Sequence, residues 1–182
     1  VVAESLIRAY TAIFPGLEHV SVWARRPEQA QALLGRMTGI KVKLSVAEDL
    51  ATAAASADII SSATMAHMPV LKGEWITPGT HVDLIGAFKA DMREADDALI
   101  SSGSLYVDSR DTTLHHIGEL MIPLAAGVID ENDVKGDFYD LIASGTKARK
   151  SDDEITVFKN GGGAHLDLMI ADYIFSAVAS KS

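Results

Sequence analysis

Cysteine is absent from this chain of 182 residues. Its absence excludes disulfide bonds, thiolate zinc sites and cysteine nucleophiles within the span, and it favours a cytoplasmic location. Long apolar runs are missing as well: no stretch of about 20 apolar residues occurs, so we expect no membrane-spanning segment. Basic residues are outnumbered, with 16 Lys and Arg against 25 Asp and Glu and a formal net charge of −9. Because no basic stripe is present to bind phosphates, we expect no nucleic-acid partner.

A phosphate loop of the form G-x-G-x-x-G is also missing. The chain opens at Val1, without methionine, in a helical pattern that ends at Pro15-Gly16. A helix that leads into a strand is the second half of a β-α-β unit. We therefore expect a fragment, or the ordered part of a longer chain, whose first strand and phosphate loop lie upstream. Apolar residues make up 48% of the sequence, which is typical of a globular domain with a sizeable core.

Strand and helix patterns alternate along most of the chain. Helices are expected at residues 27–34, after Ser45 (which forms a capping box with Glu48), and from Ala164 to about residue 179. The alternation predicts a parallel sheet with helices on both faces, although the pattern loosens from about residue 111. The closing helix is apolar along most of its length, so we expect it to be buried between layers. The predicted strands are residues 20–24, 40–44, 57–62, 80–85, 104–107 and 154–158.

The first predicted strand ends in two arginines. In a dinucleotide-binding fold, the strand after the first crossover helix ends in Asp or Glu when the cofactor is NAD, because a carboxylate accepts from the ribose 2′-hydroxyl. Here Ala24 takes that position and Arg25 and Arg26 follow. A planar guanidinium binds a 2′-phosphate bidentately, so the pattern favours NADP over NAD. The alternative is a solvated arginine pair at the end of a strand.

Several segments, taken in order, resemble the ornithine cyclodeaminase/mu-crystallin family over essentially all 182 residues. Each motif is weak alone, but their joint order and spacing are specific. The segments are Ala57-Asp58-Ile59-Ile60 with Thr64; Gly73-Glu74-Trp75-Ile76-Thr77-Pro78-Gly79-Thr80-His81; Ile85-Gly86-Ala87 with Arg93-Glu94 and Asp96; Tyr106-Val107-Asp108-Ser109; and Glu154-Ile155-Thr156-Val157-Phe158-Lys159 with Gly162, Ala164 and Asp167.

The resemblance implies an α/β protein with a Rossmann-type, doubly wound parallel sheet that is incomplete at its N-terminus. Residues 1–153 correspond to the NAD(P)-binding domain without its first strand and glycine loop. Residues 154–182 correspond to a strand and a helix that cross back to a separate N-terminal substrate and dimerisation domain. The family's substrate-binding lysine and arginine lie in that domain, so no catalytic residue is named here. The resemblance also implies a homodimer that acts on a small amino-acid or imino-acid substrate.

The family motifs also imply which residues bind the cofactor. Thr64 and Met65 follow a strand at its carboxyl end, where dinucleotides lie in an open α/β sheet, although Thr64 also fits an ordinary loop hydroxyl. Small residues at Ile85-Gly86-Ala87 let the backbone approach the nicotinamide. Asn160 replaces the serine of the family's turn and still donates and accepts hydrogen bonds. The implied cofactor-binding residues are Ala24, Arg25, Arg26, Gln29, Thr64, Met65, Ile85, Gly86, Ala87 and Asn160.

Phe88 bears on the type of reaction. Cyclodeaminases of the family carry an acid/base aspartate at this position, and a phenyl ring cannot transfer a proton. Relatives without that aspartate are dehydrogenases and ketimine reductases, so the resemblance favours an NADP-dependent oxidoreductase that reduces a ketimine or imino acid to an amino acid, or runs the reverse. The alternatives are ornithine cyclodeamination, which is a lyase reaction, and a protein that binds NADP and a small ligand without turnover. Fold alone does not choose among them.

Other polar residues are weaker candidates. His115, His116 and Glu119 invite a metal site, but zinc takes at least three ligands and no further ligand pair stands nearby, so we expect no metal and simple polar residues at a domain edge. Lys159 is expected to be a surface lysine at the end of a strand rather than a catalytic base. Asp108 and Ser109 are expected to cap the end of a strand on the ligand side of the sheet.

Overall fold

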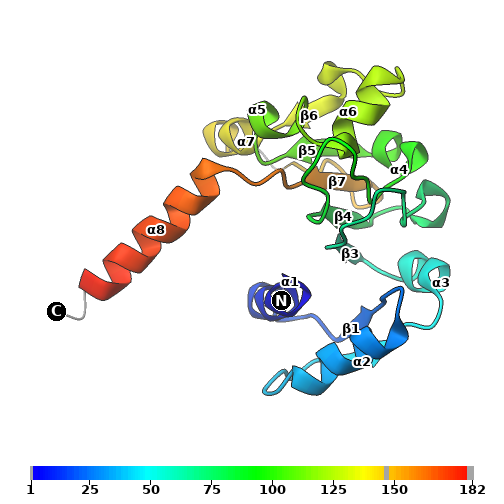
Figure 1. Ribbon diagram of the computed structural model, residues 1–182, viewed down its shortest axis with the longest axis vertical. Helices are drawn as coiled ribbons and strands as arrows, with labels where there is room; N and C mark the ends of the chain where they lie inside the picture. The colour runs from blue at the N-terminus through cyan, green and yellow to red at the C-terminus, as the bar shows by residue number, and fades with distance from the viewer. Residues whose placement is uncertain (1, 146–147, 180–182) are drawn as a thin grey trace.

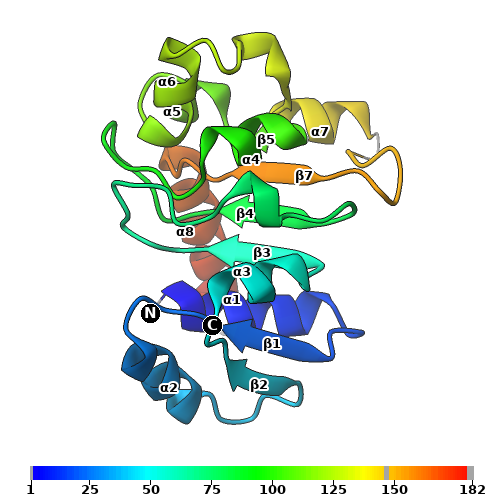
Figure 2. The ribbon, with the colours of Figure 1, turned by 90° about the vertical axis from the view of Figure 1, so that its right-hand side faces the viewer.

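The strands lie in two parallel sheets in this computed structural model, which describes residues 2–145 and 148–179. The smaller sheet pairs β1 (His19–Val22) with β2 (Lys43–Val46). The larger sheet has the strand order β3-β4-β7-β5-β6, and all its strands run parallel. The strand arrows in Figure 2 point the same way, so the carboxyl ends of the strands share one edge. The strands of the larger sheet are β3 (Ile59–Ser62), β4 (His81–Leu84), β5 (Ser104–Val107), β6 (Val134–Gly136) and β7 (Thr156–Lys159).

Helices cover both faces of the larger sheet. Figure 1 shows α3 and α4 on one side and α1 and α7 on the other. The expected doubly wound α/β architecture is therefore confirmed. Strands β1 and β3 are not paired with each other, in agreement with a sheet that is incomplete at its N-terminus. The helices are α1 (Val2–Ile13), α2 (Pro27–Arg36), α3 (Leu50–Ala55), α4 (Asp97–Ser102), α5 (Arg110–Thr113), α6 (Gly118–Ala125), α7 (Phe138–Ser144) and α8 (Ala164–Ala179), with 3-10 turns η1 (Gly73–Trp75) and η2 (Glu131–Asp133).

The core lies between the larger sheet and the helices that cover it. Val82, Leu84, Val107 and Val157 are fully buried, because strands covered on both faces are apolar on both faces. Helix α1 is tied to this sheet by Tyr10, whose hydroxyl donates a 2.7 Å hydrogen bond to an Asp83 carboxylate oxygen. Burial, and then the Asp83 carboxylate, raise the pKa of Tyr10.

The predicted capping box at Ser45 is wrong. Ser45 lies inside β2, where it pairs with Ser21, so its backbone belongs to the sheet. The residue that caps α3 is Asp49, whose carboxylate accepts from the backbone N–H of Thr52 at 2.8 Å. Both residues have the chemistry of an N-cap, and the pairing of β2 decides between them.

From residue 111, where the sequence pattern loosens, the chain continues in short helices and a short strand. This part of the chain holds most of α5 as well as α6, η2, β6 and α7, each too short to show a clear hydrophobic period. Asp130 and Asp137 begin η2 and α7 with capping boxes, and Pro123 lies inside α6. Residues 146–147 lie outside the described residues, as do Val1 of the first predicted helix and residues 180–182.

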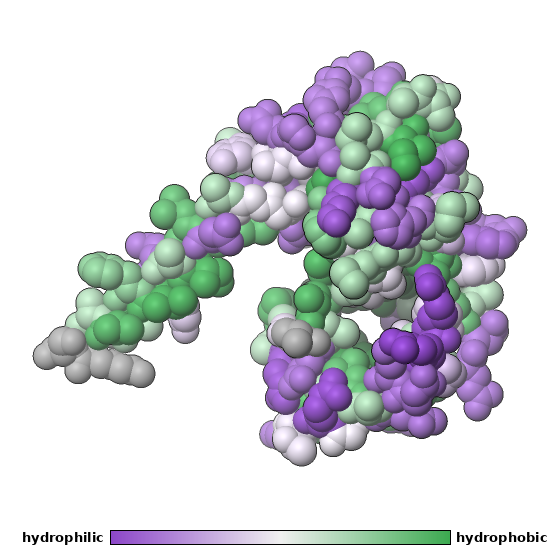
Figure 3. All heavy atoms as spheres, in the orientation of Figure 1, coloured by the Kyte–Doolittle hydropathy of each residue, from purple (hydrophilic) through white to green (hydrophobic). Residues whose placement is uncertain are grey.

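Helix α8 projects away from the rest of the chain (Figure 1). None of its residues is buried, and Figure 3 shows hydrophobic side chains along much of its surface. The expected burial between layers is therefore wrong for the described chain, because no element of these residues covers the helix. Within the described ranges, no helix combines the length and the apolar character needed to cross a bilayer.

Candidate functional site

The carboxyl edge of the sheets brings the predicted cofactor residues together. Thr64 and Met65 follow β3, Asn160 follows β7, and the segment Ile85-Gly86-Ala87 follows β4. The other four lie just beyond β1 and at the start of α2: Ala24, Arg25, Arg26 and Gln29. Dinucleotides bind open α/β sheets at this edge, so these residues lie where such a cofactor would bind. The role of each residue remains a proposal.

A buried carboxylate, Glu94, links the loops after β3 and β4. Its Oε1 atom accepts from the backbone N–H of Thr64 at 2.6 Å, from the Thr64 hydroxyl at 2.8 Å and from the Ser62 hydroxyl at 2.7 Å. Its Oε2 atom accepts from the backbone N–H groups of Gly86 at 2.5 Å and Ala87 at 3.2 Å. Glu94 stood within a family motif, but its role was not anticipated. An acidic residue in a segment that is otherwise buried was the available signal, because buried carboxylates need hydrogen-bond donors.

Glycine is required at position 86 because the two loops approach closely. A Cβ atom there would lie 1.9 Å from the Thr64 carbonyl oxygen and 2.2 Å from the Thr64 nitrogen. The backbone at this position was predicted to approach the nicotinamide. In the structure it also lies directly against the neighbouring loop of the protein.

A second buried layer lies beneath Glu94. Glu119 is fully buried and accepts from the backbone N–H groups of Glu94 at 2.8 Å and Ala95 at 2.9 Å. Burial raises the pKa of Glu119, and the two backbone hydrogen bonds oppose that shift. The expectation that Glu119 is a simple polar residue at a domain edge is therefore wrong. Packing of α6 under the loop after β4 buries its carboxylate, whereas His115 and His116 are exposed.

Lys159, expected at the surface, is fully buried at the end of β7. Its ammonium group donates to the carbonyl oxygen of Leu84 at 3.0 Å. Burial lowers the pKa of Lys159, and the carboxylates of Glu119, Glu94 and Asp108 act against that shift. The prediction failed because β7 lies at the centre of the sheet, where the end of a strand is covered on both faces.

Asp108 anchors the glycine-rich turn that follows β7. Its buried carboxylate accepts from the backbone N–H groups of Gly161 and Gly162, both at 2.9 Å, and from that of Ser109. Gly162 has a φ of 70°, a left-handed conformation that favours glycine. The turn places Asn160 at the edge, with its side-chain oxygen accepting from Gly162 and its backbone N–H donating to Leu84. Asp108 thus lies at the carboxyl edge of the sheet, where it holds the turn after β7.

Arg25 and Arg26 are exposed at the carboxyl end of β1. Neither forms an ion pair with another described residue. Arg26 is the N-cap residue of α2. When the Gln29 amide is oriented with its oxygen toward Arg26, that oxygen accepts from the Arg26 guanidinium. Two cationic groups without acidic partners at this position fit a phosphate. Ala24, before them, places no carboxylate there.

Large apolar side chains surround the edge. Met65 and Met68 are exposed after β3, at 72% and 76% of their surfaces. Phe88 lies in the loop after β4 and is 52% exposed. The Lys89 ammonium lies 5.5 Å from the centre of the Phe88 ring. Exposed apolar side chains therefore lie beside the polar loops at this edge.

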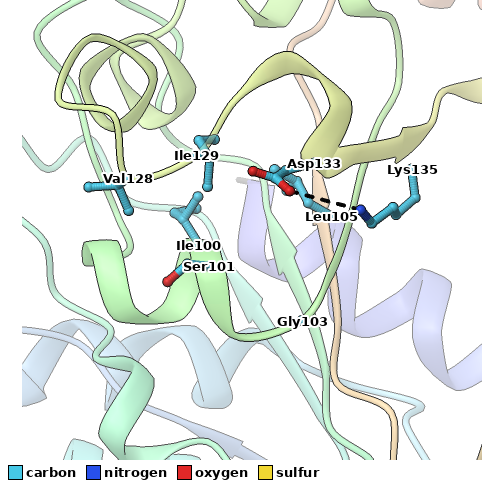
Figure 4. A pocket seen from close by; sticks show the side chains of 8 residues that line it. All are labelled: Ile100, Ser101, Gly103, Leu105, Val128, Ile129, Asp133 and Lys135. Atoms are coloured by element: carbon cyan, nitrogen blue, oxygen red, sulfur yellow. Dashed lines mark ion pairs between the residues drawn. The ribbon is translucent and has the colours of Figure 1, made fainter.

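Neither the His115-His116 pair nor a pocket at the other edge of the sheet forms part of this site. His115 pairs with Glu131 at 3.3 Å, and the described residues contain no group of three or more His, Cys, Asp or Glu side chains placed to hold a metal. A pocket of about 350 Å³ lies at the opposite edge, at the amino ends of β5 and β6, where Asp133 and Lys135 pair at 3.9 Å (Figure 4). It is lined by Ile100, Ser101, Gly103, Leu105, Val128, Ile129, Asp133 and Lys135.

Comparison with known proteins agrees with this geometry. The chain is 64% identical over 98% of its length to a Delta(1)-pyrroline-2-carboxylate reductase of Paracoccus denitrificans, and covers 56% of that protein. A structure of the Thermococcus litoralis Delta(1)-pyrroline-2-carboxylate reductase in complex with NADH and L-proline superposes with a TM-score of 0.83 at 31% identity, over 88% of this chain and 50% of that one. An archaeal alanine dehydrogenase dimer with bound NAD gives a TM-score of 0.88 at 27% identity, over 98% and 55%.

The chain spans about half the length of these relatives. The sequence model of the ornithine cyclodeaminase/mu-crystallin family matches residues 1–182, the whole of the chain. This protein therefore belongs to the ornithine cyclodeaminase/mu-crystallin family.

Proposed function

We propose that this chain is the dinucleotide-binding part of an NADP-dependent reductase that converts a cyclic ketimine acid, such as pyrroline-2-carboxylate, to the corresponding amino acid. The observation that carries the proposal is the 64% identity to the Paracoccus reductase over nearly the whole chain. Phe88 supports it, because the family's cyclodeaminases have an acid/base aspartate at this position.

The residues at the carboxyl edge fit a nicotinamide dinucleotide. Arg25 and Arg26, which pair with no carboxylate in the described part of the chain, supply cations for a 2′-phosphate, and this is the basis for proposing NADP over NAD. The bound NADH and NAD of the two structural neighbours support a nicotinamide cofactor and do not distinguish between the two forms. Thr64, Ile85, Gly86, Ala87 and Asn160 are proposed to face the nicotinamide end, with Met65 beside them.

A bound nicotinamide supplies the hydride that reduces the imine carbon, and the imine nitrogen takes up a proton to give the amine. The residues of this chain orient the ring and keep water from it. Phe88 and Met65 provide apolar surface, while Asn160 offers an amide beside the strand ends. The group that protonates the nitrogen and the groups that hold the substrate carboxylate are proposed to lie in the substrate domain.

Two further properties are proposed for the whole protein. A homodimer is supported by the archaeal alanine dehydrogenase, which is described as a dimer. A cytoplasmic location remains a prediction from the sequence. The division of the chain at residue 153 also remains a prediction.

The test is the oxidation of NADPH by the intact protein with pyrroline-2-carboxylate, followed at 340 nm, with NADH as the comparison and a parallel assay of ammonia release from ornithine. Oxidation that favours NADPH supports the proposal. Ammonia release without oxidation would establish the lyase instead. Binding of NADPH with neither activity would leave a binding protein or a different substrate.

A further inference from the structure

Glu94 lies at the centre of the candidate site and has no assigned role. It is fully buried, and its carboxylate receives all five of its hydrogen bonds from the ends of β3 and β4 and the loops that follow them. A carboxylate offers about four lone-pair positions, so these five donors saturate it. It therefore has no capacity left for a ligand, and acts through the groups that it holds.

Those groups are Thr64, Gly86 and Ala87, which the proposed function places against the nicotinamide end. Backbone hydrogen bonds also join the two segments, from the Ile85 N–H to the Ser62 carbonyl oxygen at 2.8 Å and, farther along the loops, from Arg93 to Ala66 and from Val70 and Leu71 to the Glu94 carbonyl oxygen. At Thr64, Gly86 and Ala87, the hydrogen bonds to the Glu94 carboxylate hold the two loops together. Gly86 allows the loops to meet, since any side chain there would overlap the backbone of Thr64.

The hydrogen bonds also decide what the edge offers to a ligand. The Thr64 hydroxyl has one proton and donates it to Glu94 at 2.8 Å, so toward a ligand this oxygen only accepts. The N–H groups of Gly86 and Ala87 are likewise committed to Glu94. At this point of the edge a ligand therefore meets the Thr64 hydroxyl as an acceptor. The N–H groups of Gly86 and Ala87, which would suit a phosphate, are not free to donate to it.

Two other buried side chains, Glu119 and Lys159, hold Glu94 in place. Glu119 accepts from the backbone N–H groups of Glu94 and Ala95, and the buried ammonium of Lys159 acts electrostatically on both carboxylates. Such support fixes the carboxylate before any ligand binds, which is how a positioning residue lowers the cost of ordering a site.

We propose that Glu94 is a positioning residue for the nicotinamide end of the cofactor: it fixes the spacing between Thr64 and the Gly86-Ala87 segment and orients Thr64 to accept a hydrogen bond from a ligand N–H or O–H group. The inference rests on the proposed function and deepens it, because it names the ligand chemistry at one end of the same site.

The experiment compares two ligands in the intact protein. NADPH carries the nicotinamide, and 2′-phospho-ADP-ribose lacks it while keeping the adenosine end. Glu94→Gln replaces one carboxylate oxygen with a donor, so we expect NADPH affinity to fall about tenfold while the affinity for the fragment stays within about twofold. Bound NADPH fluorescence should shift toward that of free NADPH, because the ring loses its fixed surroundings.

A second pair of variants keeps Glu94 in place. Thr64→Val removes the hydroxyl and keeps the backbone N–H, whereas Thr64→Ser keeps both. We expect about tenfold weaker NADPH binding for Thr64→Val and a change within about twofold for Thr64→Ser, again with little effect on the fragment. This pair decides the question even if Glu94→Gln fails to fold.

The outcomes separate the inference from the proposed function. Equal losses for NADPH and the fragment would show a general structural role and overturn the inference, as would unchanged NADPH binding in Thr64→Val. Wild-type protein that binds neither ligand would overturn the proposed function itself, and the inference with it.

Discussion

The Lys159 ammonium lies 3.0 Å from the Leu84 carbonyl oxygen, and both residues are fully buried at the ends of the neighbouring strands β7 and β4. Lys159 therefore ties two strands together at the edge where the cofactor is proposed to bind. It also brings positive charge close to the buried carboxylates of Glu119, Glu94 and Asp108.

Replacing this lysine should destabilise the protein. Lys159→Met keeps an unbranched side chain and removes the charge, which leaves buried carboxylates without their counter-charge. We expect the free energy of unfolding to fall by about 3 kcal/mol in urea denaturation at pH 7. Lys89→Met, at an exposed position, is the control and should change it by less than about 0.5 kcal/mol. Similar small changes in both variants would refute the electrostatic role of Lys159.

Cofactor preference should depend on Arg25 and Arg26. Replacing both with alanine removes the two cations proposed to hold the 2′-phosphate. We expect NADPH binding to weaken by roughly tenfold to hundredfold and NADH binding by less than about threefold, as measured by fluorescence titration. Arg36→Ala, in the last turn of α2, controls for the loss of charge and should leave both affinities nearly unchanged. Equal losses for the two cofactors in the double variant would argue for a solvated pair.

Two glycine-to-alanine variants should change stability in opposite directions. Gly86→Ala forces a methyl group onto the backbone of Thr64, and we expect a loss of about 3 kcal/mol or more. Gly35→Ala, inside α2 with open space around its Cβ position, should raise stability by about 0.5–1 kcal/mol. Thermal unfolding of both variants checks the pair. A tolerated alanine at position 86 would mean that the two loops lie farther apart in solution.

Stability should fall in mild acid because of His81. Burial lowers the pKa of this side chain, Arg149 acts in the same direction and Asp83 opposes them. The unfolded state then binds a proton below pH 6.5 that the folded state resists, so this contribution is present above about pH 6.5 and is lost as the pH falls toward the lowered pKa.

Urea unfolding between pH 8 and pH 5 measures the effect, and His81→Asn should flatten the pH profile. If the His81→Asn variant shows the same pH profile as the wild-type protein, groups other than His81 cause the pH dependence.

The parallel sheet could be predicted from sequence because its strands are short apolar runs separated by helices. The arginines at the end of β1 could be identified because they stand at a fixed position after a strand. Burial of Glu94, Glu119 and Lys159 could not, because it depends on contacts between distant segments: Lys159 meets Leu84, 75 residues away. Helix α8 shows the converse, since an apolar pattern indicates that a helix needs a cover and does not say which part of a protein supplies it.

The position of β7 has a consequence for synthesis. This strand pairs with β4 on one side and β5 on the other, yet it follows both in the chain. While the chain is being made, the facing edges of β4 and β5 have no partner until residues 156–159 leave the ribosome. The larger sheet therefore closes only after β7 has been synthesised, and a chain that stops short of β7 exposes two strand edges that favour aggregation.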